Sequence, residues 1–438
     1  MSHQSQAARF FSSPVLIIGL AIASRLLWPI QSDAADISTT FPAVADLPVQ
    51  TNMPNPLVAD DGKTIATPEQ WQAHREEMKA IIEHYALGHA PPPPGNVAGH
   101  EIESRLLADG KVNYRLVHLT FGPDEKLGLD ISIFLPVETN GIKAPFPTIV
   151  HPSFSAVSES PPLPMTNAIV TGTNSVPAKK PPGYHTFISL ESAAREYRQA
   201  LDRGYAVVTF FYQDCGQDGG DYRKTGFFRA YPHCDWADLR AWAWGMSRCV
   251  DYLESQSFAD KSKFVAVGHS RLGKATLVAG AFDERFALCA PCGSGCGGTG
   301  AYRFNGQGRG GREGLENIVK SFPQWTIPRL AEFSGQVEKL PFDQHWLIDL
   351  VAPRVFIAPD GLNDSAASVN ALVQSYLAAK PAYALLGVPE HLGINFRPGK
   401  HMLAPEDWTA ILDFADQQLR GLDVKRRFDQ LPPPEPAP

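Results

Sequence analysis

Residues 263–274 read KFVAVGHSRLGK, an apolar strand pattern that passes through Gly268-His269-Ser270 directly into a helix pattern. A serine at such a sharp strand–turn–helix junction is typical of a nucleophile elbow, in which Gly268 leaves room for the chain to reverse. A second small residue is expected near the helix start, and here it is Gly273, three positions after the serine rather than two. The segment predicts an α/β-hydrolase fold with Ser270 as the candidate nucleophile.

Around this turn the sequence alternates strand patterns with helix patterns. The later strands are short apolar runs, typical of a parallel sheet with helices on both faces, whereas the first two alternate in polarity. We expect one mostly parallel, doubly wound sheet with loop insertions, among them the proline-rich segment 155–182. The expected strands are 114–121, 129–134, 148–151, 206–211, 264–267, 286–290, 355–358 and 382–386. The expected helices are 67–85, 192–202, 235–255, 272–281, 367–377 and 404–419.

A serine hydroxyl needs a base and an orienting acid, which follow the serine in this fold in the order acid, then histidine. His401 lies in RPGKHML, a loop before the last expected helix, and is the predicted base, with His391 on the same connection as second choice. The strand pattern RVFIAPD leads into the loop DGLND. That loop supplies the predicted acid, Asp364 in preference to Asp360, which would hold the imidazole tautomer and stabilise the imidazolium.

Two cations follow the serine. Arg271 and Lys274 fall in the first turn of the expected helix, where the helix dipole disfavours positive charge. Because they are three residues apart, both can address one side of the helix start. Such cations are explained if they face a developing oxyanion or electron-rich substrate oxygens. The alternative is that they pair with surface carboxylates such as Asp283 or Glu284.

Composition narrows the class of protein. The 438-residue chain is 44% hydrophobic with a net charge of −7, so it can bury a large core and has no general attraction for nucleic acid or anionic lipid. Cys289, Cys292 and Cys296 lie close together, but no neighbouring cysteine or histidine cluster completes a four-ligand metal site, and buried thiols or one disulfide are expected. The glycine-rich loop DCGQDGGDYR, which carries Asp214 and Asp218, is expected to be solvated and not to bind calcium.

The start of the chain is typical of a secretory signal peptide, with Arg9 before a short apolar run at 15–23 and small residues for cleavage near Ala34. The apolar run is too short for a comfortable membrane span. We therefore expect export, to the periplasm or outside the cell, with an uncleaved anchor or a disordered start as alternatives. The predicted segments are a leader over 1–36, an α/β-hydrolase domain over 45–425 and a disordered proline-rich tail over 426–438.

Several stretches together resemble the bacterial branch of the glucuronoyl esterases, carbohydrate esterase family 15. The most specific are GHSRLGK at 268–274 and LPFDQH at 340–345. The stretches TPEQWQAHREEM, DRGYAVVTFFYQD, AWAWGMSRCVDYL, SFPQW and RPGKH add support, and the resemblance runs from about residue 55 to residue 419.

This resemblance implies specific roles. By position, Ser270 would be the nucleophile, His401 the base, and Arg271 a group that stabilises the oxyanion. Lys274 would contact hydroxyl or methoxy oxygens of a glucuronoyl ring, and Glu313 would contact the sugar. The implied reaction is hydrolysis, through an acyl-enzyme and without cofactor or metal, of the ester between 4-O-methyl-glucuronate on xylan and lignin alcohols.

The sequence departs from the family pattern at three places. Gly293 stands just before the SG-x-GG stretch, where many members carry the acid, so the acid must come from Asp364 or Asp360. The loop after Val150 reads HPSFSAV, and a sugar-stacking tryptophan is absent from NDSAASV. Two alternatives therefore stay open, another carbohydrate ester such as acetyl xylan as substrate, or an inactive hydrolase fold that only binds carbohydrate. A monomer with a plant cell-wall polysaccharide as its partner is expected.

Overall fold

The computed structural model describes residues 1, 41–139, 141–158, 187–304 and 313–433. Residues from Phe41 onward form one compact unit. The predicted leader, apart from Met1, and residues 159–182 of the predicted insertion lie outside the described residues.

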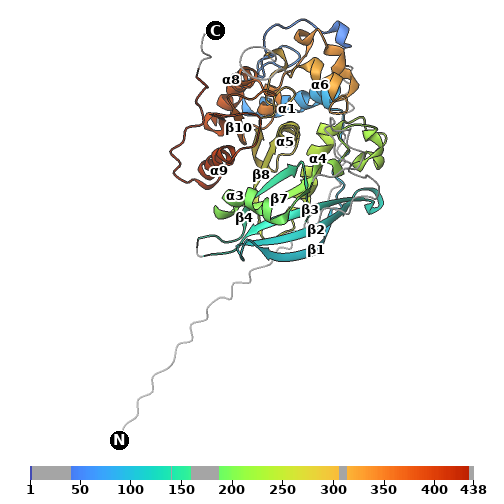
Figure 1. Cartoon of the computed structure of the whole chain (residues 1–438). Helices are drawn as coiled ribbons and strands as arrows, with labels where there is room; N and C mark the ends of the chain where they lie inside the picture. Colours follow the sequence, from blue (N-terminus) through green and yellow to red (C-terminus); the bar gives the residue numbers. More distant parts are fainter. Residues whose placement is uncertain (2–40, 140, 159–186, 305–312, 434–438) are drawn as a thin grey trace, which may run out of the picture. The chain divides into compact units, whose positions relative to one another are not determined.

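The described part of this unit is built on a nine-stranded sheet in the order β1-β2-β3-β7-β4-β8-β9-β10-β11 (Figure 1). Strand pairs from β1 to β7 are antiparallel, and those from β7 through β4 to β11 are parallel. The strands are β1 (Ala98–Leu107), β2 (Val112–Phe121), β3 (Leu127–Pro136), β4 (Phe146–Ser153), β7 (Ala206–Phe211), β8 (Ala259–His269), β9 (Phe286–Cys292), β10 (Val355–Gly361) and β11 (Leu392–Arg397). A separate pair joins β5 (Ala156–Val157) to β6 (Phe187–Ile188).

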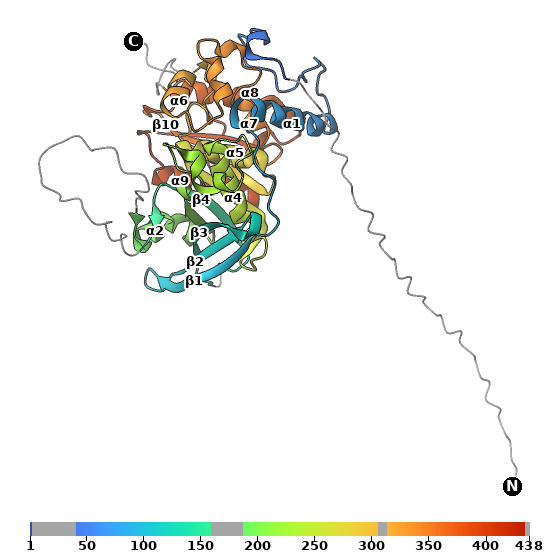
Figure 2. The same ribbon diagram turned by 90° about the vertical axis from the view of Figure 1, so that its right-hand side faces the viewer.

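Helices cover both faces of this sheet (Figures 1 and 2). Consecutive residues of β8 show why its sequence is apolar throughout, because Val265 belongs to one buried cluster and Ala266 to the cluster on the opposite face. The first cluster is completed by α2, α3 and α9, and the second by α1, α4, α5, α7 and α8. The helices are α1 (Pro68–Ile82), α2 (Leu190–Glu196), α3 (Arg198–Asp202), α4 (Asp238–Leu253), α5 (Arg271–Phe282), α6 (Leu315–Ser321), α7 (His345–Asp349), α8 (Val369–Leu385) and α9 (Pro405–Arg420).

This mostly parallel, doubly wound sheet confirms the predicted fold class, but two strands differ from the prediction. Residues 382–386, expected as a strand, form the last turn of α8 and its C-cap Leu386, and Ala382 and Tyr383 are buried there. A short apolar run does not by itself distinguish a buried strand from a buried helix, and the helix expected over 367–377 continues through Pro381, which lies inside it. The last strand is instead β11. The edge strand β1 was missed because most of its residues are exposed and its sequence has no apolar alternation.

The chain stays packed beyond residue 425, so the predicted tail begins too early. The Ile394 amide donates a hydrogen bond to the Phe428 carbonyl oxygen at 2.6 Å, and the Phe428 ring packs on Phe414 with 4.6 Å between centroids. Cys289, Cys292 and Cys296 are buried free thiols, and the described residues contain no cluster of three possible metal ligands. Within the described ranges, no helix is both long and apolar enough to cross a membrane.

Candidate active site

Ser270 lies on the turn between β8 and α5, at the carboxyl edge of the parallel strands. Its backbone has φ 59° and ψ −127°, a conformation that L-residues rarely adopt and that marks a strained nucleophile elbow. The Ser270 amide donates to the Cys292 carbonyl oxygen at 3.0 Å, which ties the turn to the end of β9. A Cβ at Gly268 would lie only 2.5 Å from the Leu272 carbonyl oxygen, so the turn requires glycine there.

Gly273 takes the role expected of the second small residue, although it stands one position late. A Cβ on it would lie 2.9 Å from the Cys292 carbonyl oxygen and 3.1 Å from that of Gly268. These contacts mean that α5 approaches the ends of β8 and β9 too closely for a side chain at 273. The spacing differs from the usual pattern, but the steric requirement is the same.

Three side chains form a continuous hydrogen-bonded chain at this edge. His401 Nε2 lies 2.8 Å from Ser270 Oγ, and His401 Nδ1 lies 2.7 Å from Asp364 Oδ2. The other carboxylate oxygen, Asp364 Oδ1, accepts from the amides of Ala366 and Ala367 at 2.7 and 2.9 Å. The structure therefore brings together the predicted nucleophile, the first-choice base and the first-choice acid.

The adjacent parallel strands β10 and β11 explain how the acid and the base meet. Their carboxyl-end loops are joined by the amides of Leu362 and Asn363, which donate to the Arg397 and Gly399 carbonyl oxygens, both at 2.9 Å. The Arg397 side chain then holds the histidine loop from the other side, with Nη2 donating to the Met402 carbonyl oxygen at 2.6 Å. The backbone on both sides of His401 is thus held, at Gly399 by a backbone amide and at Met402 by a guanidinium.

The two candidate acids differ in charge. Burial acts to raise the pKa of Asp364, but the hydrogen bonds from His401 and from the two backbone amides outweigh burial, and the pKa is lowered. Burial, with the nearby charge of Asp364, raises the pKa of Asp360 well above its ordinary value. Asp360 Oδ1 accepts from the Gly361 amide at 2.7 Å, and among the described residues Asp360 makes no hydrogen bond to His401. The two surroundings therefore shift the two pKa values in opposite directions, in favour of a charged Asp364 and against a charged Asp360.

His269 is nearer the site than the sequence suggested. Its ring packs against that of His401 with 4.5 Å between centroids, and burial, assisted by His401, lowers its pKa to about 3. A Cβ at Gly293 would lie 3.2 Å from the His269 ring and 3.5 Å from Asp364 Oδ2. The position at which the family resemblance led us to expect an acid is therefore beside Asp364, and here it holds only backbone.

The second-choice base is elsewhere. His391 precedes β11, in the turn η10 (Pro389–His391), so it lies at the amino end of the strand whose carboxyl end carries His401. His391 Nδ1 bonds the Pro353 carbonyl oxygen at 2.7 Å. This interpretation of His391 was wrong because the last strand was expected ten residues too early in the chain.

Arg271 pairs with an aspartate that sequence reasoning did not select. Its Nη1 donates to Asp218 Oδ2, and its guanidinium lies 5.0 Å from the centre of the Trp325 ring. Asp283 and Glu284, the alternative partners considered above, pair instead with Arg285 and Arg75. The guanidinium therefore points toward the loop after β7 and the segment after α6.

Asp218 collects four donors although its loop was expected to be solvated. Its side chain is only 3% exposed. Besides Arg271, it accepts from Tyr212 Oη at 3.0 Å, Gln324 Nε2 at 2.7 Å and Trp325 Nε1 at 2.8 Å. Asp218 thus joins three segments that are far apart in the chain. No local pattern signals this, because glycine-rich aspartate loops are mostly solvated.

Lys274 and Glu313, both expected from the family resemblance to contact the sugar, also contact each other. Lys274 Nζ donates to Glu313 Oε2 at 2.9 Å and to the Ser294 carbonyl oxygen at 2.6 Å. The ammonium lies 5.5 Å from the centre of the Trp325 ring, which stacks on Phe322 with 3.9 Å between centroids and 4° between planes. The stacked pair stands beside both cations and was not singled out from the sequence.

The doubly wound sheet carries a serine on a strained turn, a histidine and a buried carboxylate, and this combination defines the α/β-hydrolase class. Comparison with known proteins shows that the chain is a carboxylic-ester hydrolase. Residues 133–387 match the family described as glucuronyl esterase, fungi. The chain belongs to this glucuronoyl esterase family, carbohydrate esterase family 15.

Three relatives illustrate the similarity. The chain is 28% identical over 405 residues to carbohydrate esterase MZ0003 of an unknown prokaryotic organism, covering 86% of this chain and 91% of the relative. It is 27% identical to a 4-O-methyl-glucuronoyl methylesterase of Schizophyllum commune, covering 86% and 84%. A solved glucuronoyl esterase of Caldicellulosiruptor kristjansonii superimposes with a TM-score of 0.68 at 28% identity, covering 87% of this chain and 94% of that one.

Proposed function

We propose that this protein hydrolyses 4-O-methyl-glucuronoyl esters that link glucuronoxylan to lignin alcohols, through an acyl-enzyme on Ser270. The observation that carries the proposal is the hydrogen-bonded chain from Ser270 Oγ through His401 to the charged Asp364, on a turn with positive φ. The names of curated relatives, 4-O-methyl-glucuronoyl methylesterases, supply the substrate class. The leader predicted from the sequence would export the enzyme to where such polysaccharides lie.

The mechanism follows from this geometry. Ser270 Oγ attacks the ester carbonyl carbon while His401 Nε2 takes the hydroxyl proton, and the carbonyl π electrons move to oxygen. Collapse of the tetrahedral intermediate breaks the bond to the alcohol, which leaves with the proton from His401. Water, deprotonated by the same nitrogen, then attacks the acyl-enzyme and releases the uronic acid and free Ser270. Asp364 keeps the imidazole in the required tautomer and stabilises its charged form.

The developing oxyanion has donors at the start of α5. The backbone N–H of Arg271, in the first position of the helix, has no intrahelical acceptor and is the donor that this fold commonly supplies. The Arg271 guanidinium adds positive charge on the same side, and Asp218 holds it there. On the sugar side, Lys274 and Glu313 offer a donor and an acceptor to ring oxygens.

The substrate is tested by comparing two esters. Purified enzyme should hydrolyse benzyl glucuronate, and its 4-O-methyl form better, with kcat/KM at least roughly 10²-fold above its kcat/KM on acetylated xylan, because the Lys274–Glu313 pair offers a donor and an acceptor that a uronoyl ring can use and an acetyl group cannot. Release of benzyl alcohol and of acetate are the readouts. Preference for acetylated xylan would replace this function by acetyl xylan esterase activity. No hydrolysis of either ester or of an aryl acetate would favour the inactive, carbohydrate-binding alternative.

Arg271→Ala is expected to lower kcat by roughly 10²-fold with little change in KM, because it removes charge that faces the oxyanion. Asp218→Asn keeps the shape of the side chain but removes the charge that holds the guanidinium, and we expect a smaller fall of roughly 10-fold. Steady-state kinetics with benzyl glucuronate, together with thermal melting, checks both. If Arg271→Ala lowered the melting temperature sharply and left kcat intact, Arg271 would be a structural ion-pair residue.

A further inference from the structure

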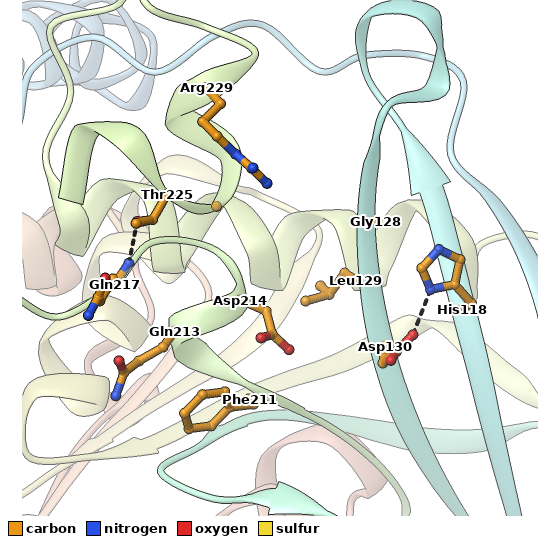
Figure 3. A pocket seen from close by; sticks show the side chains of 11 residues that line it. His118, Gly128, Leu129, Asp130, Phe211, Gln213, Asp214, Gln217, Thr225 and Arg229 are labelled. Atoms are coloured by element: carbon orange, nitrogen blue, oxygen red, sulfur yellow. Dashed lines mark hydrogen bonds and ion pairs between the residues drawn. The ribbon is translucent and has the colours of Figure 1, made fainter. Parts of the chain in front are cut away.

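A cavity of about 400 Å³ opens at the same edge of the sheet as Ser270 but outside the site described above (Figure 3). We call it the side pocket. It lies between the turn that joins β2 to β3 and the loop that follows β7. Its volume is within the range of pockets that hold small ligands. The residues that line it are His118, Gly128, Leu129, Asp130, Phe211, Gln213, Asp214, Gln217, Thr225, Gly226 and Arg229.

The order of strands in the sheet places the side pocket close to Ser270. The strands β7 and β8 are separated only by β4, so their carboxyl ends are about 10 Å apart at the usual strand spacing. The turn η4 (Tyr212–Asp214) forms the partition. Tyr212 Oη reaches Asp218 on the catalytic side, whereas Gln213 and Asp214 line the side pocket. A ligand larger than one sugar ring can therefore contact both places.

Several polar groups in the side pocket lack protein partners. The side chains of Asp214, Gln217 and Arg229 make no hydrogen bond to another residue in the described ranges. Figure 3 shows Arg229 extending from one wall toward the space in front of Asp214 and Leu129. Burial, with Asp130 nearby, raises the pKa of Asp214 to about 7. A partly buried carboxyl without a partner is costly unless a ligand or water pairs with it.

The walls of the side pocket are held in place by the protein itself. The Gln217 amide donates to Thr225 Oγ1 at 2.9 Å, and the Phe227 amide donates to the Cys215 carbonyl oxygen at 2.9 Å. Gly226, at φ +48°, passes so close to the Cys215 carbonyl that no side chain would fit. The space therefore exists before any ligand binds, which reduces the entropic cost of binding.

The chemistry of the lining selects among ligand classes. Asp130 pairs with His118 Nδ1 at 2.6 Å, and Asp214 opposes the single arginine, so the lining has no excess of positive charge to favour an anion. The described residues offer no three-ligand metal cluster. Carboxylates accept, the guanidinium donates and the glutamine amides do both, so the ligand must carry both donors and acceptors. Phe211 and Leu129 add an apolar surface. A neutral ring with several hydroxyl groups and an apolar C–H face meets all of these requirements.

We propose that the side pocket binds a neutral sugar ring of the polysaccharide that carries the uronoyl ester. This inference rests on the proposed function, and it makes the enzyme selective for esters on an oligosaccharide over esters of a single uronic acid. The loop 212–229 then serves two purposes. Its Asp218 holds Arg271 beside the ester, and its Gln217 and Asp214 hold a sugar ring in the side pocket.

The test uses two substrates with the same leaving group, benzyl glucuronate and the benzyl ester of glucuronate carried on a xylo-oligosaccharide. The ratio of kcat/KM for the second to that for the first should fall roughly 3- to 10-fold in Asp214→Ala and again in the double variant with Gln217→Ala. Asp221→Ala is the matched control, because this exposed residue of the same loop pairs with Lys224 outside the side pocket. Its ratio should equal that of the unmodified enzyme.

A second measurement is independent of turnover. Calorimetric titration of a neutral xylo-oligosaccharide into Ser270→Ala should show binding that weakens by the same factor when Asp214→Ala is added. An unchanged ratio, or an equal loss on both substrates, would overturn the proposal, as would titrations that do not differ between the two variants. If the unmodified enzyme hydrolysed neither ester, the proposed function would fail, and the titration would still decide the side pocket.

Discussion

Ser270→Ala is expected to reduce kcat by a factor on the order of 10⁴ to 10⁶, because no other hydroxyl in the described site lies within hydrogen-bond distance of His401 Nε2. The variant should still fold, since the substitution removes a single oxygen atom and leaves the packing around the turn unchanged. The measurement is benzyl alcohol release under saturating benzyl glucuronate, with thermal melting to verify folding. Residual activity within 10-fold of the unmodified enzyme would show that a different group attacks the ester.

His401→Ala should cause a loss of similar size, and the double variant should be no worse than either single one. The reason is that base and nucleophile act as a unit, so removal of one leaves nothing for the other to contribute. Additive losses would contradict the view that the 2.8 Å contact between His401 Nε2 and Ser270 Oγ is the one used in the reaction. His391→Ala, outside the site, is the matched histidine control and should retain full activity.

The two candidate acids should separate clearly by experiment. Asp364→Asn is expected to lower kcat by roughly 10² to 10⁴-fold, because an amide can present its N–H to His401 Nδ1 and favour the wrong tautomer. Asp360→Asn introduces a neutral group of the same shape where burial already disfavours the charged carboxylate, and kcat should stay within about 5-fold of the unmodified enzyme. Both variants are compared by steady-state kinetics across pH.

This pair of variants is its own control, since Asp360 near the end of β10 and Asp364 in the loop that follows are four residues apart and the substitution is the same. A large loss from Asp360→Asn with a small one from Asp364→Asn would reverse the assignment of the acid. Equal large losses would indicate that the two carboxyls share one function, with a proton between them.

The elbow could be predicted because its requirements are local. A buried strand, a glycine that avoids a clash, a serine and a helix start follow one another along the chain, and the structure keeps them in that order. His401 could also be selected from the sequence, since this needed only the rule that the base precedes the final helix. By contrast, the last strand was misplaced, because apolar residues at 382–386 satisfy a buried helix as well as a buried strand.

The surroundings of the elbow could not be predicted because their contacts join distant segments. Asp218 and Arg271 are 53 residues apart, and Gln324 and Trp325 reach the same carboxylate from more than 100 residues away. Each of these residues has an ordinary local context. Only the packing of the loop after β7 against α5 and the segment after α6 turns a glycine-rich aspartate loop into a buried hub.

The sequence by itself determined the class of fold and predicted the sharp turn and the candidate nucleophile and base, because those depend on short-range sterics and on the order of strands. The tertiary structure decided which aspartate bonds His401, what holds Arg271 and that a second pocket opens at the same edge of the sheet. These follow from burial and from the distance between side chains of different loops. Both quantities exist only once the sheet brings the carboxyl ends of its strands to a single edge.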